Sequence, residues 1–432
     1  MTRHEENYIK IRLKDACESI FSGGTPDTRK PEYWGGEYLW LSSGETRNKF
    51  IKTAEKTITK DGVDNSSTRL AKIGDVLIAS AGQGKTRGQT SYVLKDTYIN
   101  QSIIALRANG KKMDSLYLFY LLSGKYDTLR NMSDANAIRG SLTCKMFESM
   151  ELIVPEDVEI QKRIASLLFD YDSLIENNSR RIQILDNMAK MIYDDWFVKF
   201  KFPGYKTIKI IESETEFGEI PEGWEIKKLS DFAEITSSKR IYAKDYVESG
   251  VPFYRSKEII QKYNYEAINT ELFISRKSYD DIKSKFGVPK IGDILLTSVG
   301  TLGIPFLVNS QEEFYFKDGN LMWFKIYKKQ NSEYIYYWIQ SNSGKQNLLN
   351  TSIGTSQGAF TIVNIKQIKI IQPPKELCIE FSAIISKLQK RIELLVSTNK
   401  NLAATRNLLL PKLISGELDV SELDIKVSEV EV

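Results

Sequence analysis

The sequence is poor in histidine and cysteine, and this scarcity excludes several kinds of catalytic site. His4 is the only histidine among 432 residues. A histidine-based nucleophilic triad, an HNH-type nuclease and an ordinary zinc hydrolase therefore have no imidazole available. The three cysteines, Cys17, Cys144 and Cys378, have no Cys-x-x-Cys partner. Neither a disulfide framework nor a zinc site can be read from them, and so few cysteines fit a reducing cytosol.

The sequence also lacks long apolar runs and a marked excess of charge of one sign. No stretch approaches the ~18 uninterrupted apolar residues of a membrane span, and the N-terminal residues are polar, without the apolar core of a signal peptide. Sixty Lys and Arg stand against 56 Asp and Glu, a formal net charge of +4. Any nucleic-acid surface must therefore arise from segregated charge. We expect a cytoplasmic protein that does not contact a membrane.

What the sequence does contain is a long internal repeat. The run Ile73–Gly82 returns, with conservative changes, as Ile291–Gly300, about 218 residues later. Leu13-x-Asp15 returns as Leu229-x-Asp231, and the tyrosines at 117 and 120 return at 334 and 337. In each case a proline and then a long heptad-patterned segment follow. A period this long indicates two copies of one domain rather than a solenoid.

Each copy carries short apolar runs bounded by Gly, Asn and Ser, which predict strands rather than long helices. Because regular helices do not separate these strands, the fold class is α+β and not a doubly wound parallel sheet. The predicted strands are 37–41, 75–79, 90–94, 102–106, 293–297 and 321–324, and short helices are predicted at 115–122 and 125–131.

The segments after the two copies have the period of long amphipathic helices. Apolar residues step by four and three alternately from Ile160 to Ile192 and from Phe381 to Leu413. About 40 residues at ~1.5 Å each give a rod of roughly 60 Å. Such a narrow apolar seam needs a partner, so we expect an antiparallel two-helix coiled coil. The alternative, in which each helix packs on its own domain, is less favoured because the helices outrun a domain of this size.

One asparagine lies near the middle of each seam. We predict that Asn178 meets Asn399 or lies within a turn of it, because a slip in register would leave an amide unpaired in an apolar seam. The predicted organisation is a first domain at 1–154, a central helix at 155–204, a second domain at 205–372, a C-terminal helix at 373–416 and a flexible acidic tail at 417–432.

Two segments resemble catalytic motifs, but neither matches its motif fully. Ala79–Thr86 resembles a Walker A loop, but Ala79 replaces the first glycine and no helix follows to hold phosphates. Glu225-Ile-Lys227 resembles part of a PD-ExK nuclease, yet the first copy has Lys10-Ile-Arg12 there. Gly-x-Gly-x-x-Gly and Asn-Pro-Pro-Tyr/Phe patterns of methyl-donor enzymes are missing from the sequence. We predict no catalytic residue, no bound cofactor and no metal site in this chain.

Loops of both copies mix Lys and Arg with Asn, Gln, Ser and Thr, which supply phosphate and base-edge contacts to DNA. A single lysine in such a loop is ordinarily part of a solvated surface. The prediction of a DNA-binding surface therefore depends on these residues taken together. The candidates are Arg47, Lys49, Arg69, Gln83, Lys85, Arg87, Gln89, Arg139, Lys239, Arg240, Arg255, Lys257, Lys283, Lys285, Thr355 and Gln357.

Together these features resemble the specificity subunit of Type I restriction-modification enzymes over essentially the whole chain. The resemblance lies in the order and spacing of several motifs and not in any one of them. They are the Ile-Gly-Asp-[Val/Ile]-Leu blocks at 73–77 and 291–295, Ile220–Trp224 with Leu229-x-Asp231, Gly354–Gly358 leading to Ile370–Pro374, Gln161-x-Arg163-Ile164, and Leu410–Gly416.

The resemblance implies two target recognition domains in tandem, each reading one half of a bipartite double-stranded DNA target, with the helices as the spacer. It also implies two methyltransferase subunits docked on the helices and restriction or motor subunits joining them. S-adenosylmethionine, ATP and Mg²⁺ would then bind those partners and not this chain. The alternative is a structural adaptor with coiled-coil interactions and no DNA readout, which salt-dependent retention on DNA would distinguish.

Overall fold

The protein is described here from a computed structural model covering residues 7–82, 84–134, 140–213, 215, 217–268, 270–352, 358–421, 423 and 425. No helix in this part of the chain is long and apolar enough to span a membrane. The chain forms two compact units. Unit 1 comprises residues 1–176 and 401–432, and unit 2 comprises residues 177–400. The boundaries fall within the two long helices, α6 (Val158–Tyr193) and α12 (Lys375–Ile414).

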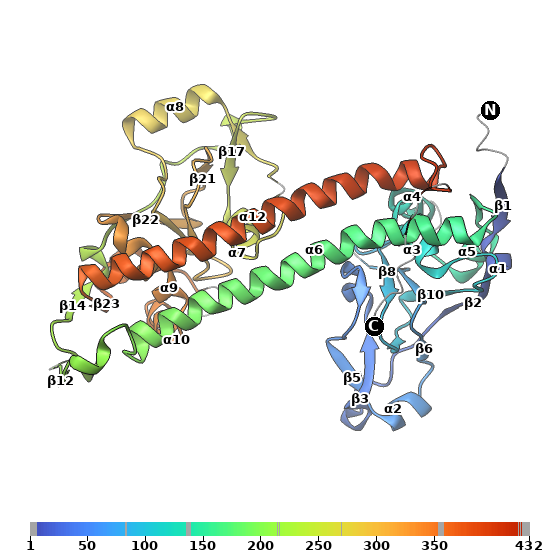
Figure 1. Cartoon of the computed structure of the whole chain (residues 1–432), viewed down its shortest axis with the longest axis horizontal. Coiled ribbons are helices and arrows are strands. Elements are labelled where there is room, and N and C mark those ends of the chain that lie inside the picture. The colour runs from blue at the N-terminus through green and yellow to red at the C-terminus, as the bar shows by residue number, and fades with distance from the viewer. Residues whose placement is uncertain are drawn as a thin grey trace. The chain divides into compact units, whose positions relative to one another are not determined.

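Unit 1 is an α+β domain with two main sheets, in which most neighbouring strands are antiparallel but β4 is parallel to β8 and β3 is parallel to β9 (Figure 1). The five-stranded sheet has the order β2-β10-β7-β8-β4, the four-stranded sheet the order β5-β3-β9-β6, and β1 pairs with β11. The strands are β1 (Tyr8–Arg12), β2 (Cys17–Ser22), β3 (Trp34–Leu41), β4 (Phe50–Ile51), β5 (Lys56–Ile58), β6 (Arg69–Ala71), β7 (Val76–Ala79), β8 (Thr90–Val93), β9 (Thr97–Ile99), β10 (Ile103–Ala108) and β11 (Glu151–Pro155).

Short helices complete unit 1: α1 (Leu13–Ala16), α2 (Lys60–Asp64), α3 (Ser115–Ser123), α4 (Tyr126–Asp134) and α5 (Cys144–Ser149). Asp114 caps α3, its carboxylate accepting from the Tyr117 amide at 2.8 Å. Residues Leu116–Leu122 of α3 are all buried, because this helix lies between the sheet and α6 (Figure 1). The main core joins α3, the five-stranded sheet and the first half of α6, with Leu168 and Leu413 among its members.

Unit 2 repeats this plan. Its main sheet has the order β15-β22-β19-β20, one strand fewer than its counterpart, and β14 pairs with β23 as β1 does with β11. Its strands are β12 (Ile210–Glu212), β13 (Glu219–Pro221), β14 (Glu225–Lys228), β15 (Ala233–Thr236), β16 (Tyr246–Val247), β17 (Val251–Tyr254), β18 (Phe273–Ile274), β19 (Ile294–Thr297), β20 (Pro305–Leu307), β21 (Tyr315–Phe316), β22 (Leu321–Ile326) and β23 (Lys369–Gln372).

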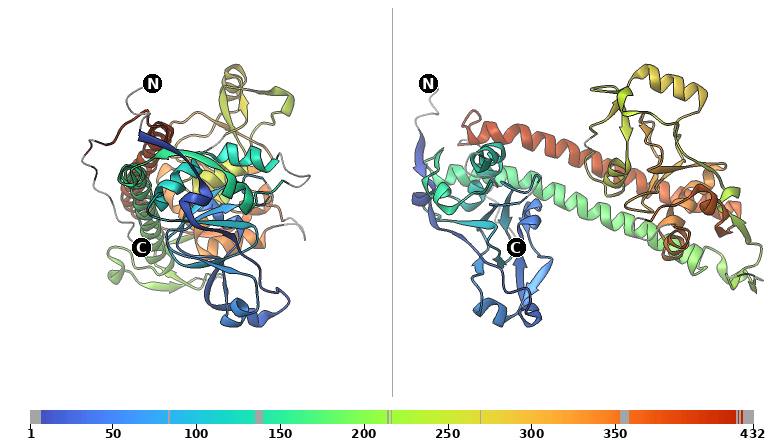
Figure 2. Two further views of the ribbon diagram at one scale, coloured as in Figure 1. Left: turned by 90° about the vertical axis from the view of Figure 1, so that its right-hand side faces the viewer. Right: turned by 180° about the vertical axis from the view of Figure 1, so that it is seen from behind.

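The helices of unit 2 are α7 (Ser256–Tyr263), α8 (Arg276–Lys285), α9 (Ser332–Gln340), α10 (Asn342–Asn350) and α11 (Ile362–Gln367). Helix α9 takes the place of α3, and all of its residues except Glu333 are buried. Helix α8 lies on the side of this unit away from α12, as two views show (Figures 1 and 2). The α+β class and the predicted strands in β3, β7, β8, β10, β19 and β22 are thus confirmed.

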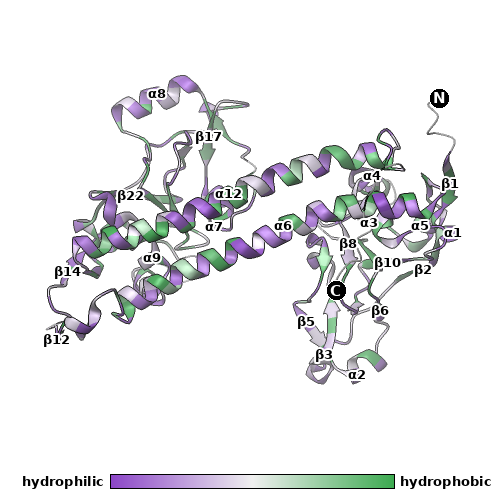
Figure 3. Cartoon of the chain, viewed as in Figure 1, coloured by the Kyte–Doolittle hydropathy of each residue, from purple (hydrophilic) through white to green (hydrophobic). Residues whose placement is uncertain are grey.

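Helices α6 and α12 pair antiparallel within each unit, as predicted. In unit 1 Asp172 of α6 binds Arg406 of α12. In unit 2 the Asn178 amide donates to the Asn399 side-chain oxygen at 2.9 Å, while the Tyr193 and Phe381 rings lie 6.2 Å apart. Later α6 residues therefore meet earlier α12 residues. The asparagine pairing is confirmed, and Figure 3 shows apolar and polar residues alternating along both helices.

The buried stripe of α6 differs from the predicted heptad seam. Leu174 and Met188, predicted to be in the seam, are 53% and 45% exposed. Ile182, Ala189 and Tyr193 are buried instead. These positions follow the 3.6-residue period of a straight helix rather than a 3.5-residue supercoil. The reason is that α6 packs on domain residues as well as on α12. The arrangement considered as the alternative, in which a long helix packs on its own domain, is therefore also present.

Two connecting segments also differ from expectation. Residues 205–216, where the sequence indicates a polar linker at the start of the second domain, contain β12, which forms a hairpin with β13. The apolar and polar residues of β12 do not alternate clearly enough for the sequence to predict a strand there. Residues 417–421, predicted as the start of a flexible tail, pack on unit 1: Val420 is buried, and Arg163 donates to the Ser421 carbonyl.

Replacing Asn178 alone by leucine is expected to cost unit 2 about 1–3 kcal/mol, because the Asn399 amide loses a partner in a largely buried seam. The double variant Asn178→Leu/Asn399→Leu should recover most of this loss, since no amide then remains unpaired. Local unfolding free energies from hydrogen exchange at 178–193 measure both changes. Equal losses in the single and the double variant would mean that the pair does not stabilise the seam.

Candidate nucleic-acid interface

The Walker-like segment of unit 1 is a tight loop between β7 and β8. Gly82, Gly84 and Gly88 have φ angles of 139°, 61° and 87°, which favour glycine. The Tyr126 hydroxyl donates to the Lys85 carbonyl, and Arg130 donates to the Gly84 carbonyl. Helix α4 thus occupies the carbonyls of the loop, and no helix begins at Thr86 to bind a phosphate. Lys85 stands exposed at the tip.

Arg87, a predicted DNA contact, is 8% exposed. Its guanidinium binds the Asp134 carboxylate and donates to the Gly140 carbonyl at 2.9 Å. In this structure Arg87 holds the loop against the end of α4. A guanidinium placed in this way positions its neighbours, and it offers little surface to a ligand.

Other candidates in unit 1 lie in ion pairs or against aromatic rings. Arg47 binds Glu55 at 2.9 Å and Lys49 binds Asp172 at 3.0 Å. Burial is the main reason that the pKa of Lys49 is lowered from its ordinary value, and Asp172 opposes that shift. The Arg69 guanidinium lies 4.1 Å from the centre of the Phe21 ring. Gln89 is half-buried at the base of the loop.

Most candidates of unit 2 are also paired. Arg255 binds the buried Glu258 at 2.9 Å, and this hydrogen bond is the main reason that the pKa of Arg255 is raised. Lys257 binds Glu271 at 3.0 Å, which lowers the pKa of that carboxyl. The remaining pairs are Arg240 with Asp318 at 2.7 Å and Lys283 with Glu313 at 3.5 Å, and the Lys239 ammonium lies 5.2 Å from the Phe286 ring centre.

Four cations on the candidate list have no ion pair in the described part of the chain: Arg69, Lys85, Lys239 and Lys285. These are free to contact a phosphate without first breaking an internal pair. Four other candidates, Gln83, Arg139, Thr355 and Gln357, lie outside the described residues.

Sequence reasoning missed two exposed cations of α8, Arg276 and Lys277. Arg276 binds Glu313 at 2.8 Å, the acid that also meets Lys283. The signal was present, because Arg276 precedes Lys283 by two helical turns and therefore lies on the same face. Nor do metal ligands gather here: among the residues that the structure describes, no three His, Cys, Asp or Glu side chains form a group able to hold an ion.

Two known proteins are similar in sequence to this chain over most of their length and most of its own. It is 25% identical to the Type I restriction enzyme MjaIX specificity subunit of Methanocaldococcus jannaschii, over 95% of this chain and 94% of that protein. It is 22% identical to the Type I restriction enzyme HindI specificity subunit of Haemophilus influenzae, over 88% and 94%. The crystal structure of a Type I restriction-modification S subunit from M. genitalium has a similar fold, with a TM-score of 0.56, 14% identity, and 94% and 96% coverage.

The model of the family described as Type I restriction modification DNA specificity domain matches residues 5–187 and residues 221–404. The two matches fall on the two halves of the internal repeat, and each includes most of the long helix that follows. Together they cover most of the chain, and the chain therefore belongs to the family of Type I restriction modification DNA specificity domains, with two copies in tandem.

Proposed function

We propose that this protein is the DNA-binding specificity subunit of a Type I restriction-modification complex, and that each domain reads one half of a bipartite target. The observation that carries the proposal is a repeated scaffold with different loops. After β7 the loop carries Lys85 and Gln89, whereas after β19 the corresponding loop, Val299–Gly303, carries no cation. Two readers of different half-sites need a common frame and unlike contact residues.

The long helices fit the second part of the proposed function. We infer that α6 and α12 set the spacing between the half-sites and offer docking surfaces to two methyltransferase subunits, which restriction or motor subunits then join. Exposed apolar residues support docking: Leu174, Ile184, Met188 and Met191 on α6, and Leu394 and Leu408 on α12. Exposed apolar residues concentrated on helices are typical of protein interfaces.

The chain itself is proposed to be non-catalytic. In that arrangement S-adenosylmethionine, ATP and Mg²⁺ bind the partner subunits, and this chain supplies the DNA sequence preference. The complex is proposed to act in the cytoplasm, where the DNA and its methyl donor are present. The alternative adaptor without DNA contact has no comparable support, because the relatives are specificity subunits.

Lys85→Ala and Lys285→Ala are each expected to weaken binding of the purified protein to duplex DNA to a similar extent on all sequences. If each lysine neutralises one phosphate, the slope of log K against log salt falls by about one unit per variant. Titrations of labelled DNA at several salt concentrations measure this slope. Lys412→Ala is the matched control, because Lys412 already binds Glu417 at 2.6 Å. Unchanged slopes in both variants would remove these two lysines from the interface, and no salt-dependent binding at all would favour the adaptor.

A further inference from the structure

The main sheet of unit 1 has an edge strand with no counterpart among the described residues of unit 2. In unit 1, β4 lies parallel to β8 at the sheet edge, and Phe50 pairs with Tyr92. In unit 2 the sheet ends at β20, and no strand of the described chain takes the place of β4. The outer edge of β20 is therefore an open sheet edge, and such an edge readily accepts an added strand.

In unit 1 the edge amides of β8 are used. Tyr92 and Leu94 donate their backbone N–H groups to the carbonyls of Lys49 and Ile51 at 2.8 and 2.9 Å. Two backbone hydrogen bonds thus hold β4 in register. A buried edge amide without such an acceptor is costly.

The corresponding amides of unit 2 belong to Leu307 and Asn309. Leu307 pairs with Ile294 as Tyr92 pairs with Val76, in the repeated Ile-Gly-Asp block. The intervening Val308 donates to Asp293 on the β19 side at 2.9 Å, so the Leu307 and Asn309 amides point toward the open edge. In the described part of the chain neither amide has an acceptor.

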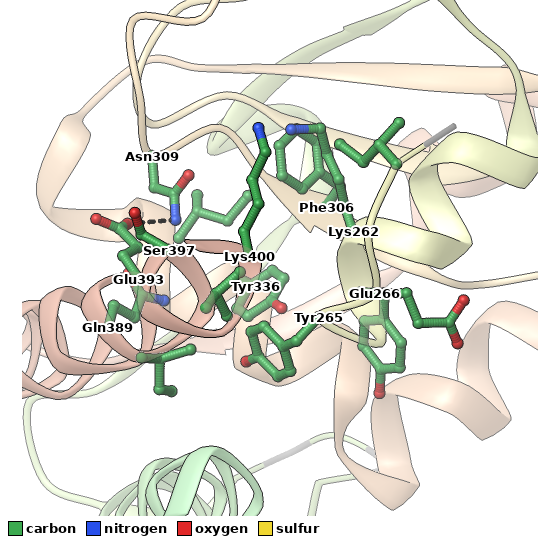
Figure 4. Close-up of a pocket in the computed structure, with 15 residues that line it drawn as sticks. Lys262, Tyr265, Glu266, Phe306, Asn309, Tyr336, Gln389, Glu393, Ser397 and Lys400 are labelled. Carbon is green, nitrogen blue, oxygen red and sulfur yellow. Dashed lines mark hydrogen bonds between the residues drawn. The ribbon is translucent and has the colours of Figure 1, made fainter. Parts of the chain in front are cut away.

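A pocket of about 310 Å³ lies along this edge, between β20, the segment after α7 and α12. Figure 4 shows Tyr265, Phe306 and Tyr336 around it, with Glu393 and Lys400 of α12 on its border. The lining is aromatic with a polar rim, as is usual for pockets that accept a ring. Lys262, at another border, is already paired with Glu312 at 2.5 Å.

In unit 1 the same place is filled by Phe50 of β4. Its ring centre lies 5.5 Å from that of Phe119 and 5.5 Å from that of Phe169. Tyr336 occupies the position of Phe119 in the matching helices α9 and α3. The pocket of unit 2 therefore lies where the internal copy places an aromatic ring.

The charges of the two places also differ. The offset that matches Asn178 with Asn399 matches Asp172 with Glu393. Asp172 binds Lys49 and Arg406. Glu393 accepts a hydrogen bond from the Asn309 side chain at 2.6 Å, and no ion pair to it is present in the described part of the chain. Beside the pocket there is thus an acid that forms no salt bridge with the described residues, although Lys390 is close enough to act on it electrostatically.

We propose that the open edge of β20 and this pocket form a docking site for an extended segment of another protein chain that carries a basic residue followed by an aromatic one. The segment adds parallel to β20, as β4 adds to β8. Its carbonyls accept from the Leu307 and Asn309 amides, its ring enters the pocket, and its cation pairs with Glu393. The internal repeat supplies the template, Lys49-Phe50. The inference does not depend on DNA recognition.

The test uses the full-length protein and a fluorescein-labelled peptide with the sequence of residues 46–53, Thr-Arg-Asn-Lys-Phe-Ile-Lys-Thr. Saturable binding by fluorescence anisotropy is expected, with at least about tenfold weaker binding when the peptide phenylalanine is replaced by alanine, as for loss of an interface anchor. A peptide with glutamate in place of the central lysine should also bind more weakly, because it places an acid beside Glu393.

Two protein variants locate the site. Val396→Trp fills the pocket from α12 and should abolish binding, whereas Ile379→Trp, at an exposed position on the same helix outside the pocket lining, should leave it unchanged. The comparison also excludes displacement of β4 in unit 1 by the peptide. The proposal is overturned if the peptide does not bind, if the alanine peptide binds equally well, or if Val396→Trp binds like the unaltered protein.

Discussion

Asp172→Ala is expected to lower the local unfolding free energy of α6 in unit 1 by about 3–5 kcal/mol, the range for breaking a buried charge cluster by removing one member. The Asp172 side chain is 5% exposed and meets three groups. It binds Arg406 of α12, it binds the Lys49 ammonium at 3.0 Å, and it accepts from the Tyr120 hydroxyl at 2.8 Å. One carboxylate therefore joins both long helices to α3 and to the residue just before β4.

The size of the effect follows from what remains after the change. Without Asp172, two cations stay close together in a poorly hydrated place, and each loses its counter-charge. Hydrogen exchange of the amides at 165–176 measures the local free energy without assuming that both units unfold together. Glu176→Ala is the control, because the Glu176 pair with Lys52 is about half exposed on both sides and should contribute less than about 1 kcal/mol.

A second comparison separates charge from packing. Asp172→Leu with Arg406→Leu removes two charges and keeps apolar volume in the seam, so it should be less destabilising than Asp172→Ala alone. If Asp172→Ala behaves like Glu176→Ala, the cluster does not hold the helices to the domain, and the apolar residues around Leu168 would carry that role alone.

Lengthening both helices by one heptad is expected to move DNA methylation to targets with a longer spacer. The insertions belong between Glu176 and Asn177 in α6 and between Lys400 and Asn401 in α12, where the boundary between the units crosses each helix. Seven residues preserve the packing face and add roughly 10 Å, equal to about three base pairs. The half-site sequences should stay the same, since both recognition domains are untouched.

The readout is methylome sequencing of cells that express the altered chain with its methyltransferase partners. Insertion in one helix only is the matched control: it adds the same residues but breaks the pairing of the helices, so methylation should be lost. Expression of this chain without the partners should give no methylation. Methylation at the original spacing by the doubly lengthened protein would show that the helices do not set the spacer.

The internal repeat and the periodicities were sufficient to predict the duplicated α+β domains, the two long helices and the meeting of Asn178 with Asn399. These features depend on local patterns, apolar alternation and heptad spacing, which the sequence displays directly. The repeat also predicts that the two asparagines meet. Each lies near the middle of its helix, and the helices are of similar length, so an antiparallel pair centred on its midpoints brings the asparagines together. The order of the family motifs was sufficient to predict the membership that the comparison then established.

Only the tertiary structure decided which side chains are free to act. The loop sequences predict DNA contacts by Arg87, Lys49 and Arg255. In the structure each of these cations is paired with an acid, either distant along the chain or three residues away. Burial and pairing depend on contacts between distant residues, which no single-sequence period reports. The same holds for the main sheet of unit 2, in which the described residues form four strands where unit 1 has five. The copies look alike in sequence, and only the fold shows that one sheet edge is covered while the other is open.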